Sequence, residues 1–380
     1  MFGHKRNSLF AFSILIGTII GAGVFGLPYV ISRSGIIPGL FYFLFLGGIV
    51  LLIHLFFGEI ILRTRGDYRL VGLGKRYLGS FANKFLSLSV VIGVLGSLLA
   101  YIVIGGEFLK ILTLGTLNLS LFQAALVFWL ILFLLFYRGV KTIMSAEVLT
   151  NVLFFLITGF IICFCLPKFN ISNFSIINLK DIFLPYGVIL YSFVGWSAIP
   201  EIIEVLKSDE DKKKIKKIII LSVVVAAMVY LAFTLAVVGV SGNSTTEDAF
   251  SGLLSFLGRD VVFWGAFAGL LTIADSFLVI ALYLFNTFIY DFKKSKTFAI
   301  IFCYGIPLVL FLIGLRSFIE IIGFVGTLLG TIEVILIILI FKKAKKEGDR
   351  KPEYEIKIPS FFLYLLMVIF ILGAITQFLK

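Results

Sequence analysis

SLFAFSILIGTIIGAGVFGLPYVI, residues 8–31 of the 380-residue chain, is an uncharged and mostly apolar run. It is long enough for an α-helix to cross ~30 Å of hydrocarbon, which takes about 20 residues. One pair of glycines at the GxxxG spacing would indicate only close helix packing. Four glycines and a proline favour local unwinding, because glycine makes non-helical dihedral angles cheap and proline lacks a backbone donor. The run therefore predicts a transmembrane helix broken near its middle, with Gly17, Gly21, Gly23, Gly26 and Pro28 around the break.

Ten more apolar runs follow, separated by short clusters of charge. Lipid offers no partner to backbone amides, so these runs must be helices or the strands of a closed barrel, and they lack the alternation of barrel strands. Only 14% of the residues are charged, against roughly 25% in a soluble domain. We predict an all-α polytopic membrane protein with about eleven transmembrane helices in one domain over residues 1–380. The ten runs are 38–62, 84–112, 119–137, 143–166, 182–206, 216–241, 259–290, 297–314, 317–341 and 358–378.

The net charge of +12 is spread unevenly over the loops. If the N-terminus, with Lys5 and Arg6, lies in the cytoplasm, most of the 33 Lys and Arg residues fall on that side. This asymmetry is the positive-inside signal of a cell-membrane protein, and an odd number of helices then leaves the C-terminus outside. Such loops set topology and contact anionic lipid, so we expect the bilayer and no nucleic acid as partner. The basic loops are 63–84, 138–141, 207–217, 293–296 and 342–357.

Residue types that build soluble active sites are scarce in this chain. Cys163, Cys165 and Cys303 lie in apolar runs, without metal-ligand or disulfide spacing. Imidazole comes from His4 and His54 alone. A membrane-embedded transferase built around His54 would need a polar cluster at the same depth, and the sequence shows none. We therefore expect no enzyme, and no cofactor other than a coupling ion.

A second broken helix is predicted at DIFLPYGVILYSFVGWSAIPEI, residues 181–202, where Gly195 lies near the centre and Pro200 follows. Leu-Gly pairs at 78–79 and 257–258 also precede the long third and eighth spans in the same way. Five helices per half would invert the second half relative to the first, and paired broken helices in inverted halves mark a transport site near the membrane midplane. The predicted units are a first repeat over 8–166, an inverted repeat over 182–341 and an accessory helix over 358–378.

Three motifs carry a family resemblance. GTIIGAGVFGLP (17–28) matches a first-helix motif G-x-x-[IV]-G-x-G-[IV]-x-x-[IL]-P, ILYSFVGWSAIPEIIE (189–204) looks like the sixth-helix motif, and TIADSFLVIALYLFNTFIYD (272–291) is similar to an eighth-helix stretch. On these motifs the chain resembles the amino acid–polyamine–organocation superfamily with the leucine-transporter fold. Within it, the chain looks most like the amino acid/auxin permeases and the bacterial aromatic and hydroxy amino acid permeases. The resemblance spans residues 8 to about 341.

The resemblance implies a substrate site between the two breaks. Free amides and a positive helix-dipole end at the first break would bind a carboxylate, and carbonyls at the second break would bind an ammonium group. The amides belong to Ala22, Gly23 and Val24, beside Gly21, and the carbonyls to Tyr191, Ser192 and Phe193. Trp196 would contact the substrate side chain, with plain packing or lipid contact as the alternative. Tyr101 would cover the site from outside, with an interfacial tyrosine as the alternative.

Asp275 is a carboxylate flanked by apolar runs, which costs at least ~2.5 kcal/mol at bilayer depth and indicates a function by default. The resemblance implies a cation site there, formed by carbonyls of the first helix and groups of the eighth, and Asp275 stands where the family usually has Thr or Ser. A carboxylate could bind Na⁺ or carry a proton itself, and a purely structural hydrogen bond is the alternative. Some proton-coupled relatives use a lysine of the fifth helix, but residues 143–166 contain none. The predicted ion-coupling residues are Gly17, Ile20, Thr272, Asp275 and Ser276.

Other acidic residues are weaker candidates. Glu201 and Glu204, in the second half of the sixth helix, are expected to belong to an inner gate or to pair with basic loops. Four more acids lie nearer the ends of predicted spans, where long side chains can reach water at little cost. These are Glu107, Glu147, Glu320 and Glu333.

The sequence thus predicts a monomeric secondary transporter that imports an amino acid by alternating access, coupled to H⁺ or Na⁺. Both breaks are lined by neutral residues, so we expect a neutral substrate, and Gly21 and Gly23 leave room for a large or aromatic one. An amino-acid-sensing receptor subunit of the same fold, which binds without transporting, is the main alternative. A transferase around His54 is the other.

Overall fold

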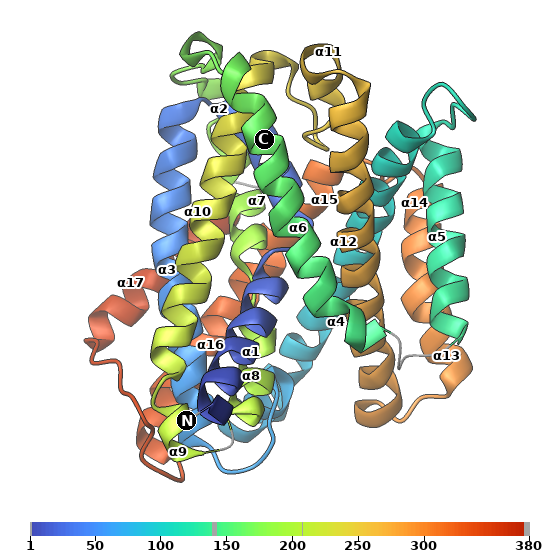
Figure 1. The fold of residues 1–380 in the computed structure, drawn as a ribbon. Coiled ribbons are helices and arrows are strands. Elements are labelled where there is room, and N and C mark those ends of the chain that lie inside the picture. Colours follow the sequence, from blue (N-terminus) through green and yellow to red (C-terminus); the bar gives the residue numbers. More distant parts are fainter. Residues whose placement is uncertain (1, 139–142, 207, 376–380) are drawn as a thin grey trace.

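The computed structural model describes residues 2–138, 143–206 and 208–375 of the chain. Over these residues every regular element is helical and no strand is formed. Figure 1 shows a bundle of long helices that run between two ends, with the N-terminus at the lower end of the view. Large apolar side chains such as Leu44, Phe81 and Leu156 are exposed on the outside of the bundle. An apolar outer surface of this kind suits a protein surrounded by lipid.

Seven helical stretches of the described chain are long and apolar enough to cross a membrane. They lie within α3 (Ile36–Arg63), α4 (Leu70–Leu112), α6 (Ile143–Cys165) with η2 (Leu166–Lys168), α7 (Leu184–Phe193) with η5 (Trp196–Ala198) and α8 (Ile199–Val205), α10 (Ile215–Ser241) with η6 (Gly242–Ser244), α12 (Arg259–Asn286) with η8 (Thr287–Asp291), and α15 (Phe318–Phe324) with η10 (Val325–Gly330) and α16 (Thr331–Glu347). The chain is therefore a multi-pass helical membrane protein.

The remaining predicted spans are bent or short. The first consists of α1 (Phe2–Ile19) and α2 (Gly23–Ser34), which pass the same test as a pair bent by 49°. Shorter apolar helices occupy three further predicted ranges, so the count of eleven crossings stays a prediction. These helices are α5 (Leu121–Arg138), α13 (Lys296–Ile300) with η9 (Ile301–Gly305) and α14 (Ile306–Leu312), and α17 (Ser360–Ile375).

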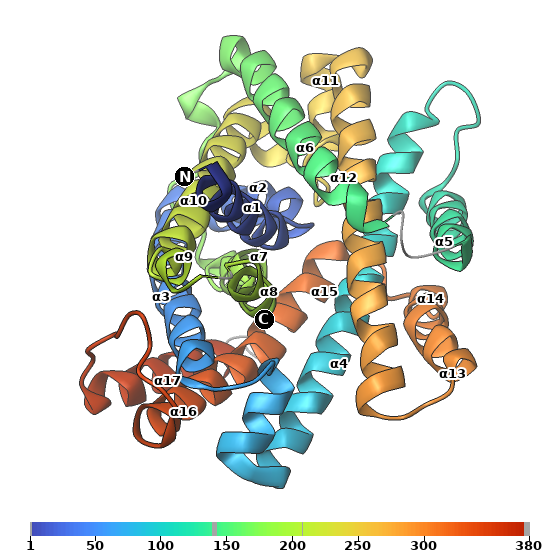
Figure 2. The ribbon, with the colours of Figure 1, turned by 60° about the horizontal axis from the view of Figure 1, so that its bottom comes forward.

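Both predicted helix breaks are present. Residues 20–22 separate α1 from α2, and residues 194–195 separate α7 from η5 and α8. Figure 2 shows these broken spans at the centre of the bundle, with α3, α10, α6, α12, α4 and α16 around them. In agreement with that central position, ten of the twelve residues of α2 are buried. Helices α5, α13 and α14 form one edge of the bundle.

The two Leu-Gly pairs adopt matching backbone corners. Gly79 interrupts α4 with φ 84° and ψ −179°, and Gly258 has φ 82° and ψ 168° between α11 (Leu254–Leu257) and α12. Positive φ with extended ψ is accessible almost only to glycine. A short helix precedes each corner, because residues 70–78 and α11 are helical.

Candidate functional site

The two breaks lie directly against each other. A Cβ placed on Gly23 would be 2.3 Å from the Ser192 Oγ and 2.7 Å from the Ser192 Cα, so no larger residue fits. None of the glycines at the breaks has a positive φ, and Gly195 has φ −160°. Left-handed dihedral angles are therefore not the reason for these glycines, although Gly195 does leave the helical region, with ψ 3°. They are needed because the two backbones approach so closely.

The other glycines of the first span touch three further helices. A Cβ on Gly17 would lie 2.2 Å from the Asn151 Nδ2 of α6, and one on Gly26 would lie 2.9 Å from Ile319 of α15. Gly21 faces the hydroxyl of Tyr101 on α4, which would be 3.3 Å from a Cβ. The first span thus uses its glycines to contact α4, α6, α7 and α15 at short range.

The first break releases backbone carbonyls. The Gly21 N–H donates to the Ile19 oxygen at 3.0 Å, and the Ile20 N–H to Ile16 at 2.8 Å. Within the described residues, no hydrogen bond reaches the carbonyl oxygens of Gly17 or Ile20. These are the two carbonyls that the sequence predicts as cation ligands. They have the acceptor capacity that such a role requires.

The same break presents backbone donors at the start of α2. The N–H of Ala22 finds no acceptor in the part of the chain that the structure describes, and Gly23 is the first residue of the helix. The Val24 N–H reaches the Gly21 oxygen only at 3.4 Å. Unsatisfied amides at a helix N-terminus attract anions. The geometry is suited to the predicted carboxylate.

The second break offers carbonyls, but two of the three predicted ones already accept hydrogen bonds. The Tyr191 oxygen accepts from the Val194 N–H at 3.2 Å. The Ser192 oxygen accepts from the Tyr230 hydroxyl at 2.9 Å. Because a carbonyl has two lone pairs, an ammonium group can still bind there. The Phe193 ring packs against Phe43 of α3, at a centroid distance of 5.2 Å, and against Tyr230 of α10, at 5.5 Å.

Tyr230 of α10 joins the two breaks, although no sequence pattern singles it out. Its single hydroxyl hydrogen is shared between the Ile19 oxygen, at 2.6 Å, and the Ser192 oxygen, so one buried phenol bridges the last carbonyl of α1 and a carbonyl of α7. The only available signal was a single tyrosine in a long apolar helix, which is common.

Tyr101 lies where three of the predicted segments meet. It is buried beside Gly21, and its hydroxyl interacts with those of Tyr191 on α7 and Ser276 on α12. The predicted substrate residues of α1, α4 and α7 and one predicted ion-coupling residue of α12 are therefore neighbours. Their functional roles stay predictions.

Trp196 faces a different group of residues. Its indole Nε1 donates to the Glu333 Oε2 of α16 at 2.9 Å, and its ring centroid lies 5.7 Å from that of His54 on α3. Glu333 is in the middle of the 30-residue stretch Phe318–Glu347, so placing it near a helix end is wrong. His54 itself has no side-chain hydrogen-bond partner among the described residues, so the expectation of no polar cluster around it is not contradicted. The contacts of Trp196 with Glu333 and His54 were not predicted, because the three residues come from three distant spans.

Asp275 of α12 pairs with the fifth span. The Thr150 Oγ1 of α6 donates to its Oδ2 at 2.9 Å, and the next residue, Asn151, is the one that touches Gly17. The Asn151 Nδ2 is buried without a partner among the described residues. Thr272 instead donates to the Ala268 carbonyl of its own helix. Thr150 and Asn151 thus connect the Asp275 and Gly17 positions, a link signalled only by two adjacent polar residues in an apolar run.

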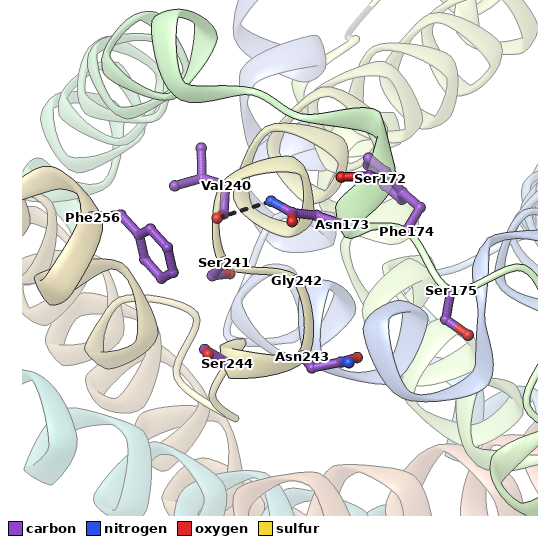
Figure 3. Close-up of a pocket in the computed structure, with 10 residues that line it drawn as sticks. All are labelled: Ser172, Asn173, Phe174, Ser175, Val240, Ser241, Gly242, Asn243, Ser244 and Phe256. Atoms are coloured by element: carbon purple, nitrogen blue, oxygen red, sulfur yellow. Dashed lines mark hydrogen bonds between the residues drawn. The ribbon is translucent and has the colours of Figure 1, made fainter.

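A cavity of about 400 Å³ lies away from the breaks, at the upper end of the bundle in Figure 1. Figure 3 shows it between the segment before α7 and the end of α10, with Asn173 donating to the Val240 carbonyl. Its lining is neutral, and none of the predicted site residues belongs to it, so we do not assign it to an amino acid zwitterion. The lining residues are Ser172, Asn173, Phe174, Ser175, Val240, Ser241, Gly242, Asn243, Ser244 and Phe256.

Two interrupted spans packed together at the centre of a multi-pass helical bundle define the chain as a membrane protein with a site built on broken helices. It belongs to the tryptophan/tyrosine permease family, whose sequence profile matches residues 4–377. A search of curated proteins finds no match. Membership in a permease family points to amino acid transport rather than to a transferase.

Proposed function

We propose that the chain imports an aromatic amino acid by cation-coupled alternating access, in a 5+5 inverted-repeat architecture with the N-terminus in the cytoplasm. The observation that carries this proposal is the contact between the two breaks, with free donors at one and carbonyls at the other. The family supports an aromatic substrate. The matching corners at Gly79 and Gly258 support the repeat.

The substrate in this proposal lies between the breaks. Its carboxylate binds the amides of Ala22 and Gly23, where the positive end of α2 stabilises it. Its ammonium group binds the carbonyls of Ser192 and Phe193. Tyr101 closes the site, and the neutral surroundings select an uncharged side chain.

Coupling in this proposal resides at Asp275. An ion drives alternating access only if it binds one conformation better than the other. Asp275 meets that need because it lies on α12 and is hydrogen-bonded to α6, so movement between these helices changes its surroundings. We propose that the ion is a proton, which a carboxylate can bind and a hydroxyl cannot.

Uptake by the purified chain in proteoliposomes tests this function. We expect labelled tryptophan or tyrosine to accumulate when an inward pH gradient is imposed at equal sodium, and lysine and glutamate not to compete. Accumulation that needs a sodium gradient at fixed pH would replace the proton by Na⁺. Binding of the amino acid without any accumulation would instead favour the alternative function, an amino-acid-sensing receptor subunit.

Asp275→Asn tests the coupling residue. It keeps the shape and a hydrogen-bonding oxygen but removes charge and titration, so it should abolish gradient-driven accumulation while substrate exchange survives. Asp260→Asn is the matched control, because Asp260 is an exposed carboxylate at the start of the same helix and should tolerate the change. Undiminished accumulation by Asp275→Asn would remove this residue from the mechanism.

A further inference from the structure

Glu333 is a second carboxyl group in the interior of the bundle, and its position is unusual for an acid. It lies at the centre of a membrane-spanning stretch and is only partly accessible. Among the described residues it forms no ion pair, and its hydrogen-bond donor is the neutral indole of Trp196 at 2.9 Å. A charged carboxylate in such a place is poorly compensated, so proton binding there is cheap.

The neighbouring elements bring few titratable groups to this carboxyl. Helices α3, α4 and α17 and η10 pack against α16. From α3, His54 contacts the Trp196 ring, at a centroid distance of 5.7 Å. Glu59, on the same helix, is paired with Arg63 near the lower end, and Glu201 of α8 is paired with Arg69. His54 and Glu333 are therefore two titratable residues that contact Trp196.

His54 directs a free nitrogen toward the second break. Its Nδ1 lies 2.8 Å from the Val50 carbonyl, which can only accept, so this nitrogen carries a hydrogen. Its Nε2 is buried and has no partner among the described residues. A Cβ on Gly195 would lie 3.2 Å from that Nε2. An unpartnered polar atom in a fully buried side chain thus faces the unwound backbone beside Trp196.

We propose that Glu333 is a second proton-binding site, separate from Asp275, and that Trp196 and His54 are positioning residues that link it to the break in the sixth span. The proton comes from bulk water and binds the carboxylate oxygen, and no other bond changes. With the carboxylate ionised, the indole hydrogen bond is charge-assisted and holds η5 against α16. Protonation weakens that bond and frees η5 and α8 to move. This proposal rests on the proposed transport function.

The test is Glu333→Gln in the purified full chain in proteoliposomes, with equal sodium and no membrane potential. Glutamine keeps the acceptor oxygen for Trp196, so the exchange rate of labelled tryptophan at equal pH should stay within about twofold of the wild-type rate. Loss of a hydrogen bond would be expected to change the rate by more than this. With a pH gradient of one unit, each coupled proton multiplies the accumulation ratio by about ten, so the variant should accumulate about tenfold less. Glu320→Gln is the matched control, because Glu320 is exposed on the same spanning stretch.

The outcomes separate this inference from the proposed function. If the wild type neither exchanges nor accumulates tryptophan, transport itself fails. If the wild type accumulates and Glu333→Gln accumulates equally, the second proton site alone is overturned. If Glu333→Gln loses both exchange and accumulation, the second proton site is also overturned, since loss of both activities indicates a structural role.

Trp196→Phe provides the second variant. It removes the indole donor and leaves the carboxyl in place, so we expect a raised KM for tryptophan with the accumulation ratio at saturating substrate unchanged. A tenfold drop in that ratio would assign the coupling effect to the tryptophan and contradict a proton on Glu333.

Discussion

The two helix breaks are built differently. The first is fixed by steric contact, since α2 is almost wholly buried and Gly23 has no room for a side chain against Ser192. Beyond the second break lies only a short half-helix, η5 and α8, which includes the exposed Ser197. Side-chain tethers hold this half: Trp196 to Glu333, and Glu201 to Arg69.

This difference indicates which part moves. Close-packed backbones cannot slide without clashes, whereas hydrogen bonds and partly exposed ion pairs exchange easily with water. We therefore expect the first break to act as the fixed wall of the site, and the half-helix of η5 and α8 as its moving part. The following variants test that assignment, beginning with the largest effect.

Gly23→Ala should abolish substrate binding, whereas Gly21→Ala should weaken it only a few-fold. The added methyl at position 23 would collide with the Ser192 backbone, and overpacking costs about 1–3 kcal/mol or more. At position 21 the neighbour is a single tyrosine hydroxyl at 3.3 Å, which can shift slightly. Equilibrium binding of labelled tryptophan checks both. Equal effects of the two variants would show that the first break is not held by steric contact.

Tyr230→Phe should weaken tryptophan binding about tenfold. It leaves the buried Ser192 carbonyl without its donor, whereas the Ile19 carbonyl keeps the Gly21 N–H, and an unsatisfied buried group costs about 1–3 kcal/mol. Tyr304→Phe is the control, because the Tyr304 hydroxyl is buried without a partner among the described residues. If both variants bind like the wild type, Tyr230 does not hold the breaks together.

Arg69→Gln should have a smaller effect. The side chains of Arg69 and Glu201 are 50% and 40% exposed, and ion pairs with this exposure contribute about 0–1 kcal/mol. We expect the exchange rate to change by at most about fivefold and the change to fade at high salt. Combining Arg69→Glu with Glu201→Arg should restore the wild-type rate. If each single variant is impaired and the double variant is not restored, the Arg69–Glu201 ion pair does not hold the half-helix of η5 and α8.

Asp349→Asn should change stability but not transport. The contacts of Asp349 with Arg65 and Arg76 join segments that we expect not to move during transport. The Asp349 carboxylate accepts from the Arg65 N–H at 2.8 Å and from the Arg76 Nη2 at 2.6 Å. These two contacts, the backbone N–H first, lower the pKa of Asp349. The stabilisation is therefore complete above the unfolded pKa of about 3.9 and is lost as the pH falls through the lower folded value.

Thermal unfolding in detergent measures this effect. At pH 7 the Asp349→Asn variant should unfold at a slightly lower temperature than the wild type. The difference should shrink in acid, as the wild-type carboxylate becomes protonated. Impaired exchange by the variant would mean that the loop after α16 belongs to the moving part.

Local pattern sufficed for much of the fold. Apolar length located the helices, and the glycine-proline clusters located both breaks, because these features are encoded by neighbours in sequence. The reason for the glycines was not predictable, since the close approach of Gly23 to Ser192 depends on how distant spans pack. The surrounding polar residues were missed for the same reason. Thr150, Tyr230 and Glu333 are polar residues within largely apolar stretches, and only the packing shows that they meet Asp275, the breaks and Trp196.

The length of the two helices that start at the glycine corners has a consequence for the surrounding lipid. The 28 residues of α12 extend about 42 Å at about 1.5 Å per residue, well beyond the ~30 Å of a hydrocarbon core, and residues 80–112 of α4 extend further. Both must therefore tilt or protrude, by an amount that depends on membrane thickness. Because α4 carries Tyr101, α12 carries Asp275 and the two helices pack together, a thinner or thicker bilayer would alter their mutual angle. Acyl-chain length thus becomes a variable that tunes the distance between Tyr101, which we propose closes the site, and Asp275, which we propose binds the ion.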